Sequence, residues 1–241
     1  MIVRAAVRPA LLLVLLLLSM PLAAAPVLHG DPLAGRDKAD TERCLECHGS
    51  AGEGQGYSNG SDGKFAKLDG QYPEYIVKQI ADFRSGRRQH EFMKMMAASV
   101  SDADLADIAA YFGAAQAMAA TTPAAAGPGA TPASAQPAAY ADAARLVASG
   151  DAARGVVACA SCHGADGRGL AAAVGPVIAG QGRRYLEQQL QDWRSGFRRN
   201  SAGSIMNQQA TRLTDADITA LAGYLSQLSP TPQPSQTPAA P

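Results

Sequence analysis

The sequence predicts a mostly α-helical protein built from two copies of one domain in tandem. Three observations lead to this prediction: blocks of similar residues recur in the same order, apolar residues recur at the spacing of a helix, and no segment shows the alternation of a strand. The offset between the copies varies from 110 to 120 residues, so the length differences fall in loops. The matched blocks are residues 30–35 and 150–155, 44–49 and 159–164, 70–71 and 180–181, 78–86 and 188–196, and 101–104 and 214–217.

The two copies divide the chain into five segments. Residues 26–113 and 140–228 are the predicted domains. Residues 114–139 are rich in Ala, Pro, Thr and Ser, which predicts a partly extended linker. Residues 229–241 have the same character and predict a disordered tail. Residues 1–25 precede the first domain and have a different composition.

The segment 1–25 has the pattern of a secretory signal peptide. Arg4 and Arg8 precede a short apolar run, and small residues follow it. The cleavage position stays open within residues 23–25, because Pro26 fits poorly directly after a cut. An uncleaved anchor is the alternative, although the apolar run is shorter than the roughly 20 residues that a spanning helix needs. Export predicts a periplasmic protein whose membrane association would come only through partners or an uncleaved anchor.

Composition narrows the function classes. The formal net charge is zero and 47% of the residues are apolar, which argues against a nucleic-acid binder and against a disordered chain. Aromatic residues make up only 5% of the sequence, which is few for two protein cores. A large apolar cofactor in each core would account for this shortage.

Three helices are expected in each copy. The first runs from the Gly-Asp motif, at residues 30–31 and 150–151, toward a cysteine pair. The middle helix of the first copy begins at Pro73 and stops at Gly86. The last helix opens with a capping box in both copies. The residues expected to face inward are Ile76, Ile80, Phe83, Leu105, Ile108 and Phe112 in the first copy and Leu186, Leu190, Trp193, Ile218, Leu221 and Leu225 in the second.

Each copy contains one Cys-x-x-Cys-His motif, the pattern of a c-type haem attachment site. The two thiols add to the vinyl groups of the porphyrin, and the histidine that follows can ligate the iron. The predicted cofactors are therefore two covalently attached haem c groups. The residues concerned are Cys44, Cys47 and His48 in the first copy and Cys159, Cys162 and His163 in the second.

Three alternatives for the cysteines fit less well. A zinc site normally has its two pairs about 15 to 20 residues apart, whereas these pairs lie more than a hundred apart. A thioredoxin-like redox pair normally lies in a βαβ setting, which the sequence lacks. Two simple disulfides, expected of an exported chain, leave the two histidines without a role.

The second axial ligand of each iron is predicted to be methionine. The second copy contains one methionine, Met206, and no histidine other than His163. Met206 lies eight residues before Thr214, and the same count back from Ser101 in the first copy gives Met93. The repeat thus selects Met93 and Met206, which lie 45 and 43 residues after the histidine of their motif.

The first copy offers rival ligands. His90 is the main one, since an iron held by two histidines is chemically sound, but the matched position in the second copy favours methionine. Met95 and Met96 are interpreted as packing residues, and His29 as a solvent-facing residue.

An iron held by histidine and methionine has six ligands. No position remains for oxygen, peroxide or substrate, and the thioether raises the reduction potential. The predicted activity is therefore electron transfer by a carrier, without catalysis. A dihaem peroxidase is an alternative that requires one open or bis-histidine iron.

With these residues in hand, the chain resembles the dihaem class I cytochromes c, most closely the cytochrome c4 family. The likeness covers roughly residues 30–113 and 140–228, and it rests on the repeated blocks and on a methionine eight residues before the last helix. The resemblance implies two class I cytochrome c domains whose haems approach each other across an approximate two-fold axis. It also implies a periplasmic, monomeric carrier between a quinol-oxidising complex and a terminal oxidase. The alternative is an electron-transfer subunit of a periplasmic dehydrogenase.

The chain departs from the family pattern in two places. Family members have a proline whose carbonyl orients the proximal histidine; the second copy keeps Pro176, but the first has Ala66 at that place. The hydrogen-bond partner of His48 is therefore open. The linker also looks longer than in the family, so the family's rigid haem-to-haem geometry is less strongly expected of this chain.

Basic residues gather near the predicted middle helices. They are interpreted either as a solvated face whose arginines neutralise haem propionates, or as a docking surface for an acidic redox partner. The residues are Arg84, Arg87, Arg88, Lys94, Arg183, Arg184, Arg194, Arg198 and Arg199.

Overall fold

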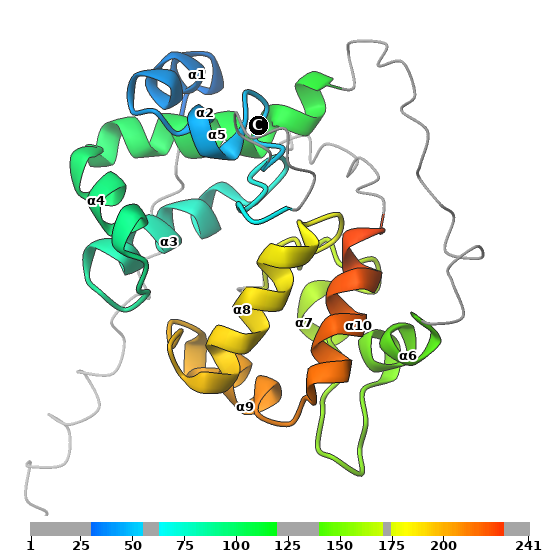
Figure 1. The fold of residues 1–241 in the computed structure, drawn as a ribbon. Coiled ribbons are helices and arrows are strands. Elements are labelled where there is room, and N and C mark those ends of the chain that lie inside the picture. Colours follow the sequence, from blue (N-terminus) through cyan, green and yellow to red (C-terminus); the bar gives the residue numbers. More distant parts are fainter. Residues whose placement is uncertain (1–29, 55–62, 120–139, 171–174, 229–241) are drawn as a thin grey trace, which may run out of the picture.

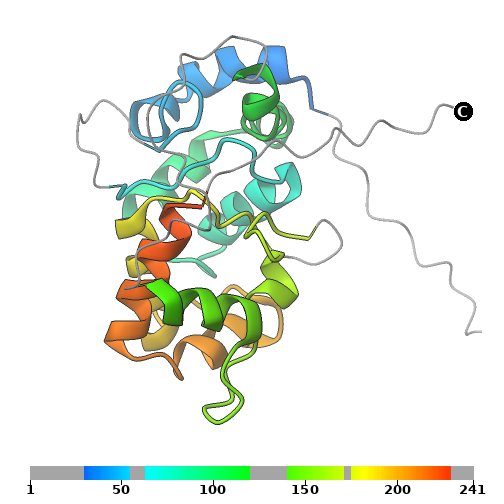
Figure 2. The same ribbon diagram turned by 90° about the vertical axis from the view of Figure 1, so that its right-hand side faces the viewer.

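A computed structural model describes residues 30–54, 63–119, 140–170 and 175–228. These residues form two helical halves that pack against each other, the N-terminal half (30–119) and the C-terminal half (140–228) (Figures 1 and 2). Among the described residues, β-structure is limited to two isolated bridges. The predicted fold class, mostly α with two repeated domains, is confirmed.

The helices follow the repeat. The N-terminal half contains α1 (Pro32–Thr41), α2 (Leu45–His48), α3 (Pro73–Arg84), α4 (Glu91–Ser99) and α5 (Asp102–Ala119). The C-terminal half contains α6 (Ala141–Ser149), α7 (Ala160–His163), α8 (Arg183–Ser195), the 3-10 turn η4 (Ala202–Ser204), α9 (Ile205–Ala210) and α10 (Asp215–Ser226). In one half α5 packs on α1 and α3, and in the other α10 packs on α6 and α8.

The two cores consist largely of the residues that the helical periodicity selects. Ten of the twelve residues expected to face inward are buried, with Ile108 and Ile218 among the most enclosed. The other two, Ile80 and Leu190, occupy matched positions and are only partly buried. The last helix begins as predicted at Thr214, where a complete capping box forms with Asp217.

The first helix of the second copy lies elsewhere than predicted. In the N-terminal half, Asp31 caps α1 by accepting hydrogen bonds from the first backbone N–H groups, and α1 follows the Gly-Asp motif. In the C-terminal half, α6 precedes the motif and ends at Gly150, which has a positive φ of 70°. Asp151 and Val156 then exchange backbone hydrogen bonds and close a turn. The structural equivalent of α1 is therefore α6, which packs on α10 as α1 packs on α5.

Two further differences concern helix number and length. Each half has an additional helix before its last one, α4 and α9, which the sequence analysis did not predict. Helix α5 continues to Ala119, beyond residue 113 where the linker was expected to begin, because this alanine-rich stretch has a high helix propensity. The predicted signal peptide 1–25, most of the linker and the tail lie outside the described residues. Across the residues that are described, no helix is both long and apolar enough to span a membrane.

The halves meet through a polar cluster with approximate two-fold symmetry. Arg88 and Arg198, 110 residues apart, are only 9% and 6% exposed, and their guanidinium groups stack on Phe83 and Trp193 at 4.7 and 4.3 Å. Arg88 donates to the hydroxyl of Tyr185 and Arg198 to that of Tyr75, both across the interface. Each arginine also donates to Gln79 and Gln189, again one glutamine from each half.

This arrangement corrects the interpretation of the basic residues. Arg88 and Arg198 lie inside the interface, so they belong neither to a solvated face nor to a docking surface. Arg84 and Arg194, at matched positions, bind the carboxylates of Asp102 and Asp215 and tie the middle helix to the last one. A sequence shows that arginines recur at matched positions but not which of them are buried, since burial depends on how the halves pack.

Asp82 is a buried anion at the edge of the same interface. It is 1% exposed and accepts hydrogen bonds from Lys78 at 2.5 Å, Arg87 at 2.8 Å and Asn200 of the other half at 2.7 Å. Burial on its own would raise the pKa of Asp82, but these three donors hold it below its usual value of 3.8. The carboxylate is therefore ionised in the folded protein and links three chain segments.

We expect Asp82→Asn to lower the free energy of unfolding by about 1–3 kcal/mol, because two cations lose their buried partner. The control is Asp192→Asn at the matched position, where the carboxylate accepts hydrogen bonds from the glutamine amides Gln188 and Gln189. Thermal unfolding of both variants measures the difference. Equal losses in the two variants would contradict the role assigned to Asp82.

The lowered pKa of Asp82 predicts how the stability of the protein depends on pH. Because the pKa of Asp82 is lower in the folded than in the unfolded chain, the folded state binds fewer protons, and its contribution is complete above about pH 5 and declines as the pH falls through 3.8. We expect the melting temperature of the natural protein to fall more steeply between about pH 5 and pH 3 than that of Asp82→Asn. Parallel curves would contradict this expectation.

Candidate functional site

Both Cys-x-x-Cys-His motifs fold into the same short turn. The first cysteine precedes a four-residue helix, α2 or α7, and its carbonyl accepts the backbone N–H of the histidine at 3.0 Å in one half and 2.9 Å in the other. Gly49 and Gly164 end the turns with positive φ of 86° and 77°, a conformation that favours glycine. The side chains of each pair thus leave one turn of helix, followed directly by the histidine.

The cysteine side chains differ in exposure. Cys44 and Cys159 pack against the hydrophobic cores of their halves. Before haem attachment, burial and the nearby Glu42 raise the pKa of the Cys44 thiol to about 11, and burial also raises the pKa of Cys159. Cys162 is exposed. In the part of the chain that the structure covers, no three His, Cys, Asp or Glu side chains gather as metal ligands.

A backbone carbonyl holds each histidine. The Nδ1 atom of His48 lies 2.8 Å from the oxygen of Ala66, and that of His163 lies 2.9 Å from the oxygen of Pro176. A carbonyl only accepts hydrogen bonds, so Nδ1 carries the proton and Nε2 keeps a free lone pair. Burial lowers the pKa of both histidines, which favours the neutral ring that a metal requires.

Ala66 therefore takes the role that the sequence left open. Its place in the loop corresponds to Pro176, 110 residues later, and the hydrogen bond depends on the backbone oxygen rather than on the side chain. The two histidines have the same kind of partner despite the missing proline. The 110-residue offset that relates the neighbouring Gly-Gln blocks identifies this residue in the sequence.

The core of each half leaves matched apolar side chains partly exposed. Leu68 and Ile80 in one half, and Ile178 and Leu190 in the other, pack on the core but are only partly buried. These residues match in pairs at an offset of 110. Two cysteines on one turn, followed by a histidine whose Nε2 is free, are the groups that haem c requires, so the residues present fit haem c.

The predicted methionine ligands occupy the two helices that the sequence analysis missed. Met93 lies on α4, which packs on α3, and Met206 lies on α9, which packs on α8; both side chains are partly exposed. Helices α3 and α8 also carry the partly buried Ile80 and Leu190. The structure thus gives Met93 and Met206 equivalent positions in their halves.

The rival ligands have other environments. His90 is exposed and precedes α4, where its Nδ1 accepts the backbone N–H of Met93 at 3.2 Å. Its imidazole therefore acts as a helix cap. Met95 is 59% exposed and Met96 is partly buried. His29 lies outside the described residues.

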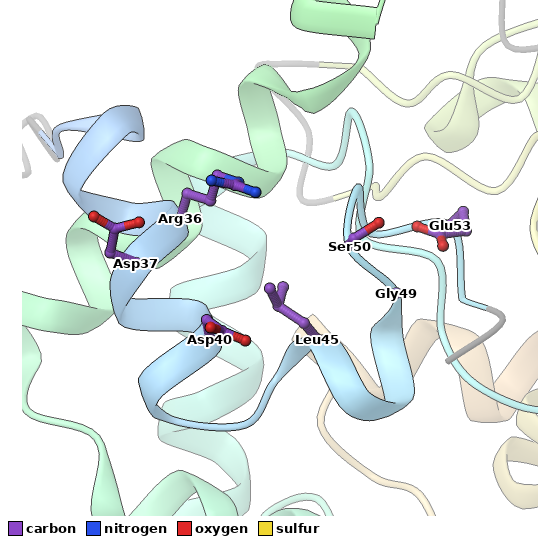
Figure 3. Close-up of a pocket in the computed structure, with 7 residues that line it drawn as sticks. All are labelled: Arg36, Asp37, Asp40, Leu45, Gly49, Ser50 and Glu53. Carbon is purple, nitrogen blue, oxygen red and sulfur yellow. The ribbon is translucent and has the colours of Figure 1, made fainter. Parts of the chain in front are cut away.

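A pocket lined mostly by polar residues lies between α1 and the first cysteine turn with the loop that follows it (Figure 3). None of the predicted haem-binding residues lines it. The lining residues are Arg36, Asp37, Asp40, Leu45, Gly49, Ser50 and Glu53.

Two helical domains, each with a Cys-x-x-Cys-His turn and a carbonyl-bound histidine, define a c-type cytochrome with two haem domains. The family model for cytochrome c matches residues 33–116 and 141–229. The chain is 39% identical over 208 residues to cytochrome c4 of Thiocapsa roseopersicina, covering 86% of this chain and 97% of that protein. The chain belongs to the cytochrome c4 family.

Two other comparisons bear on function. The solved structure of reduced cytochrome c4 from Pseudomonas stutzeri superposes with a TM-score of 0.68 at 32% identity, covering 83% of this chain and all of that one. A thiosulfate dehydrogenase electron acceptor from Stutzerimonas stutzeri is 32% identical, over 77% of this chain and 78% of its own length. This protein therefore carries two covalently attached haem c groups and transfers electrons without being an enzyme.

The loop that holds His163 depends on close backbone packing at Gly175. A Cβ atom added there would lie 2.1 Å from the carbonyl oxygen of Cys162, so the loop would have to move. We expect Gly175→Ala to lower the free energy of unfolding by about 1–3 kcal/mol and to reduce the fraction of chains that carry two haems. Thermal unfolding and intact-protein mass spectrometry measure the two effects.

The control for this variant is Gly86→Ala. Gly86 has a positive φ of 75° but no atom within 4 Å of the added Cβ, so it tests backbone strain without steric overlap. We expect a loss of about 1 kcal/mol and an unchanged haem content. An unchanged haem content in Gly175→Ala as well would contradict the steric argument.

Proposed function

We propose that each half holds its haem through the two cysteines and ligates the iron with one histidine and one methionine. The residues are Cys44, Cys47, His48 and Met93 in the N-terminal half and Cys159, Cys162, His163 and Met206 in the C-terminal half. The observation that carries this proposal is the duplication of the whole set. Both histidines are held in the same tautomer by a carbonyl, and both methionines lie on the helix packed against the middle helix.

A bound haem c supplies a one-electron couple between ferrous and ferric iron. The histidine contributes the Nε2 lone pair, and the carbonyl behind it keeps the ring oriented and neutral. The methionine would supply a thioether to the iron, which would favour the reduced state. With histidine and methionine both bound to the iron, no open position would be left for peroxide or oxygen, which argues against a peroxidase.

Met93→Ala and Met206→Ala test the ligand set. We expect each variant to lose about half of the ferric charge-transfer band near the red end of the spectrum, because one of two thioether–iron bonds is removed. Absorption spectra of the oxidised proteins measure the band. A native protein with a high-spin ferric signal that responds to peroxide would overturn the proposal.

Three control variants belong to this test. Met95→Ala and Met96→Ala remove neighbouring thioethers on the same helix, and His90→Ala removes the rival imidazole. We expect all three to keep the band at its natural intensity. An unchanged band in Met93→Ala, together with complete loss of the band in Met206→Ala, would assign the ligand of the N-terminal haem to His90 instead.

We further propose that the protein is a monomeric periplasmic carrier that takes electrons from a quinol-oxidising complex and delivers them to a terminal oxidase. Its likeness to cytochrome c4 over most of the chain supports this route. A second function, electron acceptor of a periplasmic dehydrogenase, is supported by the relative that is named a thiosulfate dehydrogenase electron acceptor.

Reduction and oxidation assays separate the two functions. For the carrier, we expect the oxidised protein to be reduced by a purified quinol-oxidising complex with quinol and then reoxidised by membranes containing a haem–copper oxidase. Stopped-flow absorption follows both steps, and bovine serum albumin in place of the oxidase membranes gives the background. Rapid reduction only by thiosulfate with its dehydrogenase, and none by the quinol-oxidising complex, would favour the second function.

A further inference from the structure

Two buried glutamines exchange hydrogen bonds across the interface in a reciprocal pattern. The Gln181 side chain accepts from the N–H of Lys67 at 2.7 Å and donates to the Lys67 carbonyl at 3.1 Å. The Gln71 side chain accepts from the N–H of Val177 at 3.0 Å and donates to the Val177 carbonyl at 3.1 Å. Both glutamines, and likewise Lys67 and Val177, are 110 residues apart, so the two contacts are related by the repeat.

Each of these contacts lies one peptide group from a histidine of the opposite half. The N–H of Lys67 belongs to the same peptide group as the carbonyl of Ala66, which accepts from His48. The N–H of Val177 likewise shares a peptide group with the carbonyl of Pro176, which accepts from His163. A continuous chain of hydrogen bonds therefore runs from the glutamine of one half, through one peptide, to the imidazole of the other half.

Burial strengthens this series of hydrogen bonds. Gln71 and Gln181 are only 5% and 7% exposed, and His163 is also buried, so the hydrogen bonds lie largely out of water. Neighbouring hydrogen bonds strengthen one another in such a setting, because each polarises the group that links them. An acceptor on the peptide N–H makes the carbonyl of that peptide a better acceptor. The imidazole N–H behind it is then bound more strongly, which makes Nε2 a stronger donor to a metal.

We propose that each glutamine is a positioning residue that tunes the reduction potential of the haem in the opposite half. The inference rests on the proposed function, in which His48 and His163 ligate the irons. A more strongly donating imidazole stabilises ferric iron, so each glutamine lowers the potential of the other half's haem. Separation of the halves removes both contacts and raises both potentials. The interface is thus a part of the redox machinery as well as a structural contact.

Gln181→Met and Gln71→Met test the crossed effect, because methionine has a similar length and does not accept as glutamine does. Redox titrations followed by NMR resolve the two haems, whose resonances are assigned through contacts with side chains of their own half. We expect Gln181→Met to raise the potential of the N-terminal haem only, and Gln71→Met that of the C-terminal haem only. In the reduced protein, the Nδ1 proton resonance of His48 in Gln181→Met, and of His163 in Gln71→Met, should move upfield.

Gln79→Met is the matched control. Gln79 is buried in the same interface and accepts from Arg88, Arg198 and Asn200, but it bonds to neither of the two peptides. We expect it to leave both histidine proton resonances unchanged. Gln181→Glu is the second variant: it keeps an acceptor oxygen for the N–H of Lys67, so the His48 proton resonance should not move upfield.

The results distinguish failure of the tuning role from failure of the proposed function. Shifts confined to the opposite half support the tuning role. Shifts in the glutamine's own half, equal shifts in both halves, or no shift in either would overturn it while leaving two histidine–methionine haems in place. A natural protein whose histidine proton resonances or absorption spectrum lacked the features of such haems would overturn the proposed function instead.

Discussion

One hydrogen bond, from a histidine N–H to a backbone carbonyl, constrains the structure of each half. It selects the tautomer in which Nε2 is free, and it fixes the ring relative to the turn that carries the cysteines. For the carbonyl to reach the ring, the loop before the middle helix must pass close to the turn, as the near contact of Gly175 with the Cys162 carbonyl illustrates. The helices on either side hold that loop in place, and burial keeps the imidazole neutral.

The packing of the two halves extends this constraint across the molecule. Buried guanidinium groups are costly unless they are hydrogen-bonded, and Arg88 and Arg198 donate to glutamine and tyrosine oxygens from both halves and stack on aromatic rings. Because the halves are copies, each half contributes the same arginine, glutamine and tyrosine to the interface, and each half's polar groups bond those of the other. The duplication thus supplies complementary surfaces as well as two sites, and the loops that hold the histidines are part of the contact.

Sequence reasoning was most reliable where a residue's role depends on its neighbours in the chain. Helical periodicity identified core residues such as Ile108 and Ile218, and local capping chemistry identified the start of α10 at Thr214. It was wrong for the first helix of the second copy, where matching letters at residues 150–151 have a different conformation. It missed α4 and α9, which are short and are held by packing on the middle helices rather than by a strong pattern of their own.

The sequence by itself determined the helical class, the duplication and the cysteine–histidine turns, and it supplied the proposal of Met93 and Met206 as ligands, because spacing along the chain and comparison of two copies are sufficient for each. Only the tertiary structure decided that the Ala66 carbonyl accepts from His48, that His90 caps a helix, and that Arg88 and Arg198 are buried. It also decided which peptide Gln71 and Gln181 contact. The His90 cap is local, but it depends on α4, which the sequence pattern did not reveal. The other features join residues about 20 to more than 100 positions apart, or depend on burial, and both are fixed only when the helices and the halves pack together.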